Sequence, residues 1–315
     1  MTCSTPSCTS CLRVRFGNKL FVPALLALTA AAEPPPPTLL FTVPAEHRLI
    51  EGIATDGHRI WLSSMLDRTI LERDDRGLRT IALPAGIPYP LGIAWDARRR
   101  WLWIASDCPA LPGITRCAQG ALVAIDRKGG LHAQASIASA FHPGDVSASE
   151  GRVFVSDSQT GAVYGWNAAT QKLDAIVPVG VGHSAQESVR IGNQLFVADY
   201  RYGIGRIDLD TKVRTLLPLP DGTALNGVDG LVRAGRWFVG VRNGAKTPAI
   251  VVFKTDDTHV TEVQVLARGG AMKDPTQIAV SGDHLLLVGE AGWDAATAGS
   301  DRTGPAPILS LPLPR

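Results

Sequence analysis

Short apolar runs alternate with turns of Gly, Asp or Asn along most of this chain. The stretch GIATDGHRIWLSS (52–64) contains a short apolar strand, a turn and a second, more apolar strand. Gly, Asp and Asn suit such turns because they tolerate the positive φ angles that tight hairpins require. No long stretch places apolar residues at the spacing of an amphipathic helix. The pattern therefore predicts an all-β chain built from hairpins.

The same hairpin pattern recurs along the sequence. Together with 52–64, the copies are 92–106, 145–157, 187–199, 229–240 and 277–289. Their anchor positions are separated by 40, 53, 42, 43 and 47 residues: Ile53, Ile93, Val146, Ser188, Leu231 and Ile278. A second pair of apolar segments follows most copies. Four strands in a unit of forty-odd residues, repeated six times, predict a six-bladed β-propeller.

The last repeat needs a strand from elsewhere in the chain. The sixth unit ends before a fourth strand, whereas the segment TLLFTVP (38–44) precedes the first unit and has no hairpin partner there. A linear array with capped ends is the alternative to a ring. The odd strand count favours a ring closed by the N-terminal strand 38–44, so the propeller is expected to occupy residues 38–315.

The N-terminal segment has the features of a targeting sequence. Three basic residues precede LFVPALLALTAAA (20–32), which is 13 residues long and ends in small residues. That length fits a signal peptide and is too short to span a bilayer. We expect a cleaved signal peptide at 1–32 and a stiff proline-rich spacer at 33–37. An uncleaved anchor or a disordered leader is the alternative.

Composition and charge narrow the range of partners. The chain has 31 basic and 29 acidic residues, and 19% of its residues are charged. Without the bases of the signal peptide the remaining body is close to neutral. This balance gives no support for a nucleic-acid surface or an anionic membrane. We expect a periplasmic or secreted protein without an integral membrane segment after signal removal, acting on a small-molecule substrate.

The longest interval between repeats contains the last two cysteines of the chain. Cys108 and Cys117 lie in SDCPALPGITRC, within the second unit. In an oxidising compartment a pair that closes one short loop is expected to form a disulfide. Two free thiols that happen to lie close together are the alternative. The predicted disulfide would hold an insertion in the second blade.

Acidic and amide residues stand where the first strands of several blades begin. In a propeller these strands line the central channel, so the entering residues lie near its mouth. They are Glu51, Leu91, Gly144 or Asp145, Gln186 or Glu187, Asp229, and Thr276 with Asp274 close by. Oxygen ligands of this kind suit Ca²⁺, Mg²⁺ or Mn²⁺. The alternative is that these acids only accept hydrogen bonds from turn amides.

The six copies, and especially Glu51-Gly-Ile and Val-Asp229-Gly-Leu, resemble the SMP-30/gluconolactonase/LRE-like family. More broadly they are similar to strictosidine-synthase-like and paraoxonase-like propellers. The resemblance implies six blades and one divalent cation near the channel mouth, with Ca²⁺ as the first expectation and Mg²⁺, Mn²⁺ or Zn²⁺ as alternatives. It also implies the hydrolysis of a sugar lactone or ester.

Carried over position by position, the resemblance assigns the metal ligands as Glu51, Asp145, Gln186 and Asp229. Gln186 stands where the family has Asn, and Asp145 replaces another expected Asn. Asp229 would also act as the general base on a water molecule. Polar residues near the blade entrances are candidate substrate contacts: His142, His183, Asn226 and Asn243. For the two histidines the alternative is a hydrogen-bonded loop residue.

The sequence thus predicts an exported, divalent-metal-dependent hydrolase of a lactone or ester. A non-catalytic propeller that binds a small ligand or a protein partner is the main alternative. A propeller enzyme with lyase or condensing chemistry is a third possibility, because one fold hosts many activities.

Overall fold

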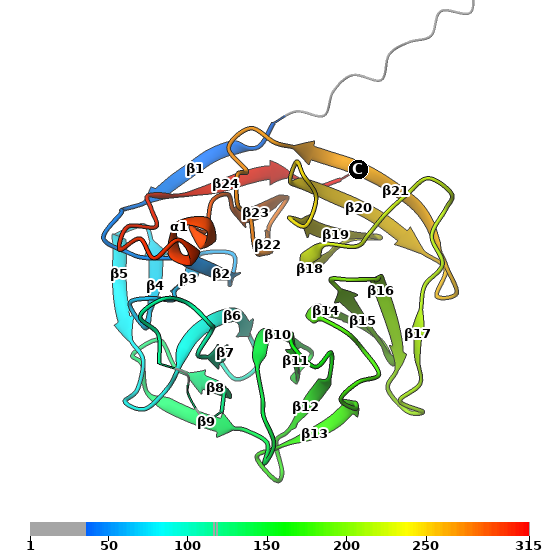
Figure 1. Cartoon of the computed structure of the whole chain (residues 1–315), viewed down its shortest axis with the longest axis horizontal. Coiled ribbons are helices and arrows are strands. Elements are labelled where there is room, and N and C mark those ends of the chain that lie inside the picture. Colours follow the sequence, from blue (N-terminus) through cyan, green and yellow to red (C-terminus); the bar gives the residue numbers. More distant parts are fainter. Residues whose placement is uncertain (1–35, 116, 118, 315) are drawn as a thin grey trace, which may run out of the picture. The chain divides into compact units, whose positions relative to one another are not determined.

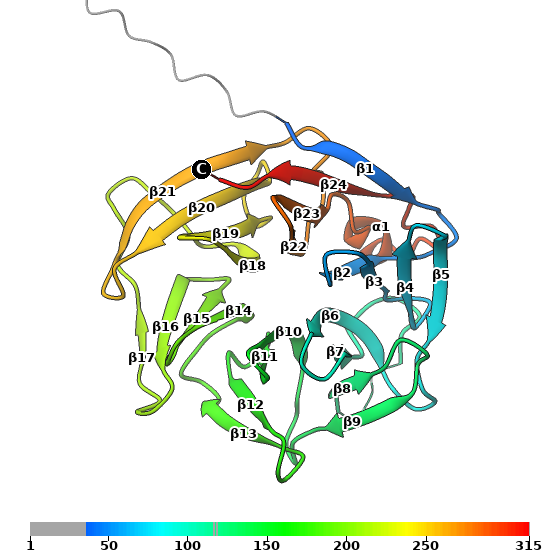
Figure 2. The same cartoon turned by 180° about the vertical axis from the view of Figure 1, so that it is seen from behind.

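The structure is a computed structural model that describes residues 36–115, 117 and 119–314. Within this part of the chain, six four-stranded antiparallel sheets stand around a central axis (Figures 1 and 2). The six-bladed β-propeller predicted from the repeats is confirmed. The predicted signal peptide at 1–32 and residues 33–35 of the spacer lie outside the described residues.

Each blade is a meander whose first strand lies nearest the axis. Blades one to three contain β2 (Ile50–Thr55), β3 (Ile60–Ser64), β4 (Thr69–Asp74), β5 (Gly77–Ala82); β6 (Tyr89–Asp96), β7 (Trp101–Asp107), β8 (Ala121–Ile125), β9 (Leu131–Ala135); and β10 (Pro143–Ser149), β11 (Arg152–Asp157), β12 (Val163–Asn167), β13 (Lys172–Val177). Blades four to six contain β14 (Ala185–Ile191), β15 (Gln194–Asp199), β16 (Gly203–Asp208), β17 (Arg214–Leu216); β18 (Val228–Ala234), β19 (Trp237–Arg242), β20 (Ala249–Thr255), β21 (Val260–Arg268); and β22 (Ile278–Ser281), β23 (His284–Val288), β24 (Ala306–Pro312), β1 (Thr38–Val43).

The N-terminal strand closes the ring. β1 pairs antiparallel with β24, so that Thr38 lies opposite Ser310 and Val43 opposite Ala306. Figure 1 shows the two ends of the described chain side by side at this blade. The last blade therefore combines one N-terminal and three C-terminal strands. This arrangement ties together segments that are far apart in sequence.

The hydrophobic core lies between neighbouring blades. The side chains of each sheet alternate between its two faces, and both faces pack against an adjacent blade. Trp61 of β3 and Trp95 of β6, for example, stack with ring centroids 4.6 Å apart across the interface of blades one and two. The large apolar side chains pack between the blades. The residues that line the axis are therefore those at the beginning and end of the first strands.

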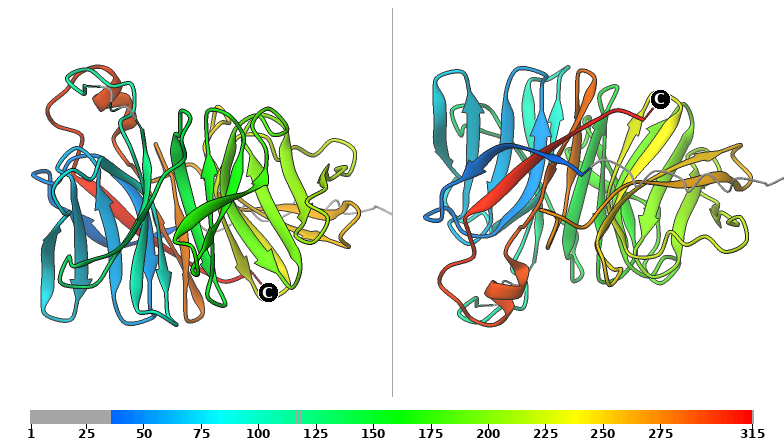
Figure 3. Two further views of the ribbon diagram at one scale, coloured as in Figure 1. Left: turned by 90° about the horizontal axis from the view of Figure 1, so that it is seen from below. Right: turned by 90° about the horizontal axis from the view of Figure 1, so that it is seen from above.

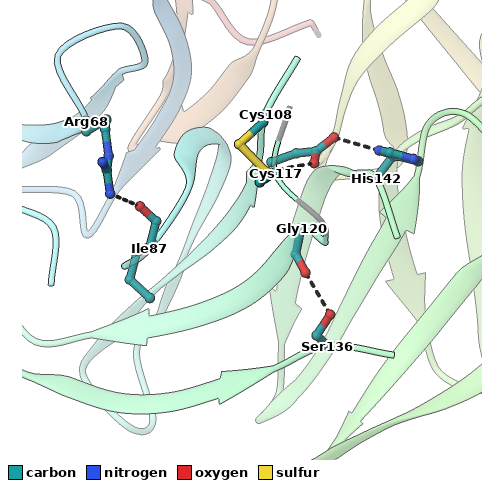
Figure 4. Close-up of a disulfide and its surroundings, with 8 residues drawn as sticks. Arg68, Ile87, Cys108, Cys117, Gly120, Ser136 and His142 are labelled. Atoms are coloured by element: carbon teal, nitrogen blue, oxygen red, sulfur yellow. Dashed lines mark hydrogen bonds and ion pairs between the residues drawn. A yellow bond between two sulfur atoms is a disulfide. The ribbon is translucent and has the colours of Figure 1, made fainter. Parts of the chain in front are cut away.

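Two segments outside the blades cover one face of the ring. Cys108 and Cys117 form a disulfide in the loop after β7, as Figure 4 shows. The short helix α1 (Trp293–Thr297) follows β23 and was not indicated by the sequence pattern. Leu111 of the disulfide loop and Ala296 of α1 belong to one apolar cluster, and both segments stand out from the same face in Figure 3. No helix in the described residues is long and apolar enough to cross a membrane.

Candidate functional site

The first strands of the blades share a local irregularity. In five of them the register with the second strand shifts close to the strand's start, for example between Ile50 and Ile53 in β2 and between Val228 and Leu231 in β18. A bulge of this kind redirects side chains and is frequent next to functional sites. Here the shifts fall at or beside the acidic and amide residues that the sequence placed at the channel.

Two successive layers of residues result. The outer layer, called here the mouth ring, is Glu51, Leu91, Gly144, Gln186, Asp229 and Thr276. The next layer, called the inner ring, is Gly52, Gly92, Asp145, Glu187, Gly230 and Gln277. The structure thereby resolves the two positions at which the sequence left a choice. Gly144 and Gln186 belong to the mouth ring. Asp145 belongs to the inner ring but lines the same pocket as these two residues, whereas Glu187 lines a pocket at the opposite end of the channel.

Glycines in the inner ring allow the blades to approach the axis closely. A Cβ atom on Gly52 would lie 2.6 Å from the carbonyl oxygen of Leu91 in the next blade. A Cβ atom on Gly230 would lie 2.9 Å from the carbonyl oxygen of Thr276. Both distances are too short for a real side chain, so these positions require glycine for reasons of space.

The mouth ring opens into a pocket of about 410 Å³ on the face that carries α1 and the disulfide loop. All four predicted metal ligands line this pocket: Glu51, Asp145, Gln186 and Asp229. Glu51 Oε2 accepts a hydrogen bond from Trp293 Nε1 at 2.5 Å. Because Trp293 begins α1, this contact joins the first blade to the helix above the channel.

Asp229 is held by a chain of polar groups. Its Oδ2 accepts a hydrogen bond of 2.7 Å from Asn243 Nδ2. Asn243 Oδ1 in turn accepts one of 2.9 Å from the hydroxyl of Tyr200. Tyr200 also lines the pocket. The predicted substrate residue Asn243 is therefore at the site, but its closest partner is the carboxylate of Asp229.

Gln186 offers an oxygen to the pocket. Its Nε2 donates to Ser184 Oγ at 3.1 Å. This hydrogen bond uses the nitrogen of the amide and leaves the carbonyl oxygen as an acceptor. The mouth ring thus supplies two carboxylates and one amide oxygen from the first, fourth and fifth blades.

Asp145 is engaged differently from the other predicted ligands. It is 4% exposed, and its Oδ1 accepts a hydrogen bond from Gln277 Nε2. Asp145 and Gln277 belong to the third and sixth blades, which face each other across the axis. Gly92 makes room for this contact, since a Cβ atom there would lie 2.8 Å from Gln277 Nε2. The inner ring therefore carries a polar bridge across the channel.

The acidic groups around the axis influence one another. Burial raises the pKa of Glu51 well above its usual range, and the nearby carboxylate of Asp229 raises it further. Burial raises the pKa of Asp229 to about 6, although the hydrogen bond from Asn243 lowers it. Burial likewise raises the pKa of Asp145 and Glu187. No Lys, Arg or His in the described part of the chain compensates these four carboxylates.

The donor set decides which cation could bind. Glu51, Gln186 and Asp229 present only oxygen atoms, and none of the residues lining the pocket is His or Cys. Oxygen donors of this type fit Ca²⁺ or Mg²⁺ better than Zn²⁺. Among the described residues no group of three or more His, Cys, Asp or Glu side chains is arranged to hold an ion. The fit therefore rests on the carboxylates of Glu51 and Asp229 and the amide of Gln186. The carboxylate of Asp145 lines the same pocket but is bound to Gln277.

None of the four predicted substrate residues lines the pocket itself. His142 has Nδ1 3.1 Å from Oδ2 of Asp107, which does line the pocket (Figure 4). The ring of His183 packs against Tyr202, with centroids 4.5 Å apart. Asn226 is exposed and accepts a hydrogen bond from Arg242. Of these three, only His142 reaches the site, and it does so through Asp107.

Two residues of the site were missed from the sequence. Trp293 lies in a segment without a counterpart in the other repeats, so repeat alignment gave no indication of it. Tyr200 directly follows Asp199 at the end of β15. Its position directly after the second strand of a blade could have indicated the site, because the loops at that end of a blade surround the channel mouth.

Comparisons with known proteins give structural relatives only. No model of a known protein family matches the chain, and no curated protein matches it. The fold is similar to that of a calcium-binding protein, regucalcin, from Agrobacterium tumefaciens strain C58, at 20% identity over 87% of this chain and 94% of that one, with a TM-score of 0.56. It is also similar to the PQQ-bound aldose sugar dehydrogenase of Streptomyces coelicolor, at 14% identity over 89% and 99% of the chains and a TM-score of 0.57. At these identities the likeness establishes the propeller fold alone.

Proposed function

We propose that the mouth-ring pocket binds one divalent cation, with Ca²⁺ as the first choice, and that the protein hydrolyses a lactone or ester there. The observation that carries this proposal is the pair Glu51 and Asp229. Both carboxylates line one pocket, repel each other and have no cationic partner in the described residues. Crowded acids of this kind are stabilised by a bound cation or by protonation.

The residues around the pocket have distinct roles in this proposal. Glu51 and Asp229 would hold the ion together with the amide oxygen of Gln186, and Asp145 would add negative charge from below. Such an ion supplies Lewis-acid polarisation of a carbonyl group. Asp229 can accept a proton from an attacking water molecule near neutral pH, since its pKa is about 6. Asn243 fixes one oxygen of Asp229 and leaves the other for this role.

Two further points support a hydrolase of the SMP-30/gluconolactonase/LRE-like type. Glu51 and Asp229 begin the first strands of the first and fifth blades, which are the places that the resemblance predicts for ligands. A structural relative, regucalcin, is a calcium-binding protein of the same fold.

Lactone turnover tests the activity. We would measure hydrolysis of simple aliphatic lactones, sugar lactones and aryl esters with Ca²⁺ and after chelation. Turnover should depend on the cation, and Asp229→Asn should lower kcat by a factor of about 100 or more. Asp283→Asn is the matched control, because Asp283 is an exposed acid far from the mouth ring. Full activity of Asp229→Asn would contradict the assignment of the base.

A non-catalytic binding propeller is the second candidate. It is favoured by the absence, in the described residues, of any group of three acidic, His or Cys side chains able to hold an ion. The same pocket would then receive a small ligand through Tyr200, Gln186 and Trp293. Binding without turnover in the lactone and ester assays would select this candidate.

We also propose that the chain is exported with removal of residues 1–32. The disulfide between Cys108 and Cys117 is compatible with an oxidising compartment. Sequencing the N-terminus of the protein recovered from the periplasm or the medium tests this. A mature N-terminus at or near Glu33 is the expected result, and an intact Met1 would contradict it.

A further inference from the structure

The channel has a second opening at the end opposite to the mouth ring. The last residues of the six first strands line a pocket of about 440 Å³ there. The bridge between Asp145 and Gln277 lies between the two pockets. This second pocket, called here the far pocket, shares no lining residue with the first pocket among the described residues. Its chemistry can therefore be considered independently of the proposed hydrolase site.

One arginine in the far pocket has an unused donor. The side chain of Arg190 is 14% exposed, and its Nη1 lies 2.6 Å from Oε2 of Glu150. Its Nε is buried and has no hydrogen-bond partner among the described residues. A buried N–H without an acceptor is unfavourable, so the present placement of this guanidinium group is not its most stable one and a shift toward an acceptor is favoured. Glu150 is 75% exposed, and an ion pair with so exposed a partner is weak and readily exchanged.

Further donors surround Arg190. Arg233 lines the far pocket from β18 in the next blade and is exposed at its rim. Ser188 and Ser147, from β14 and β10, also line it, and their hydroxyl oxygens lie 2.7 Å apart. Two guanidinium groups and two hydroxyls from three adjacent blades thus face one cavity. Arginine forks of this kind match the geometry of carboxylate and phosphate oxygens.

Charges of both signs lie at the rim. The side chain of Arg98 passes close to Gly151, in the turn between β10 and β11. Arg99 Nη1 donates to the carbonyl oxygen of Gly151 at 3.0 Å, but its charge is paired with Asp96. Two carboxylates also face the far pocket, Glu150 at the rim and Glu187 deeper in. Glu187 Oε2 accepts a hydrogen bond from the backbone N–H of Leu231, so this oxygen of the carboxylate points toward β18.

We propose that the far pocket is a binding site for a small oxyanion, a carboxylate or phosphate group, held by Arg190 and Arg233 with the hydroxyls of Ser147 and Ser188. The anion would displace the exposed Glu150 from Nη1 of Arg190. A pocket of this volume lies within the range of small-molecule sites. The two openings of the channel would then bind ligands of opposite charge: a cation at the mouth ring and an anion in the far pocket.

The test is calorimetric titration of the full chain with inorganic phosphate and, separately, with succinate, at constant ionic strength. We expect saturable binding of at least one of the two anions, and which one binds identifies the ligand group. Arg190→Gln and Arg233→Gln should each weaken the binding about tenfold or more. Arg236→Gln is the matched control, because Arg236 lies in the same turn region over Trp237 and does not line the pocket.

A second variant keeps the proposal open to refutation if Arg190→Gln does not fold. Glu150→Gln removes the exposed competitor and should tighten anion binding severalfold. The proposal is overturned if neither anion saturates below about 10 mM. It is also overturned if Arg233→Gln, Glu150→Gln and Arg236→Gln all bind like the unaltered protein.

Discussion

The carboxylate of Asp145 accepts a hydrogen bond from the side-chain amide of Gln277, which comes from the opposite blade of the ring. The contact spans the axis. Asp145 lines the pocket at the channel mouth, and the pocket at the other end has a separate set of lining residues. It depends on a small residue at position 92, because Gly92 lies directly beside both side chains. This hydrogen bond between opposite blades therefore requires the close packing that glycine at position 92 allows.

Replacing Gly92 with Ala should destabilise the protein. A Cβ atom there would lie 2.8 Å from Gln277 Nε2 and closer still to Asp145, so the bridge has to move. Overpacking of this kind costs about 1–3 kcal/mol of unfolding free energy. Denaturant unfolding of the purified variant measures the change.

Gly165→Ala is the matched control for that prediction. Gly165 lies in β12, and the nearest atom to a Cβ atom there would be 3.4 Å away, on the Ile176 side chain. We expect its unfolding free energy to stay within about 1 kcal/mol of the original. If both substitutions changed the unfolding free energy equally, the inner ring would not require glycine at position 92 for reasons of space.

Asp229 should make stability fall as pH rises. In the folded protein its pKa is about 6, above the ordinary value of 3.8. Between these values the folded state binds more protons than the unfolded state, so unfolding free energy decreases with increasing pH and the loss is complete above about pH 6. Asp229→Asn has no such proton and should exceed the original protein by up to about 3 kcal/mol at pH 8 in chelator.

Denaturant unfolding at several pH values between 4 and 8 checks this. The original protein should lose stability over the interval more steeply than Asp229→Asn. Adding Ca²⁺ at pH 8 should restore stability to the original protein and leave Asp229→Asn little changed. If the unfolding free energies of the two proteins changed with pH in the same way, the raised pKa of Asp229 would be contradicted.

Trp293→Phe should weaken cation binding without unfolding the chain. The indole N–H donates to Glu51 Oε2, and this hydrogen bond lowers a pKa that burial raises. Its loss disfavours the ionised form that would hold a cation. Hydrogen bonds to charged groups are worth about 1.5–3 kcal/mol, so the affinity for Ca²⁺ should fall about tenfold. Trp101→Phe is the control, since Trp101 stacks on His132 outside the pocket, and an identical affinity in both variants would exclude a role for the indole.

The fold could be predicted because each blade repeats the same alternation and turn chemistry. Even the closing strand was predictable, since the last repeat lacked a partner and residues 38–44 had none of their own. The helix α1 was not, because its five residues are too few for a periodic signal. Its position depends on packing against the disulfide loop through Leu111.

The candidate site was only partly accessible from the sequence. Residues that begin the first strands could be placed at the channel, but a bulge decides whether a side chain lies in the mouth ring or one layer deeper. Sequence spacing therefore could not separate Gly144 from Asp145, or Gln186 from Glu187. The contacts of Trp293 with Glu51 and of Asn243 with Asp229 join segments that no local pattern relates. Their roles in binding or catalysis remain predictions.

Calorimetric titration of the chelated protein with Ca²⁺ measures whether the mouth ring binds a cation. We expect one ion to bind per chain, and we expect Glu51→Gln and Asp229→Asn each to weaken binding at least about tenfold. Asp283→Asn should bind like the original protein. Absence of binding at millimolar Ca²⁺, or unchanged affinity in the Glu51 and Asp229 variants, would contradict the proposal that the mouth ring is a cation site.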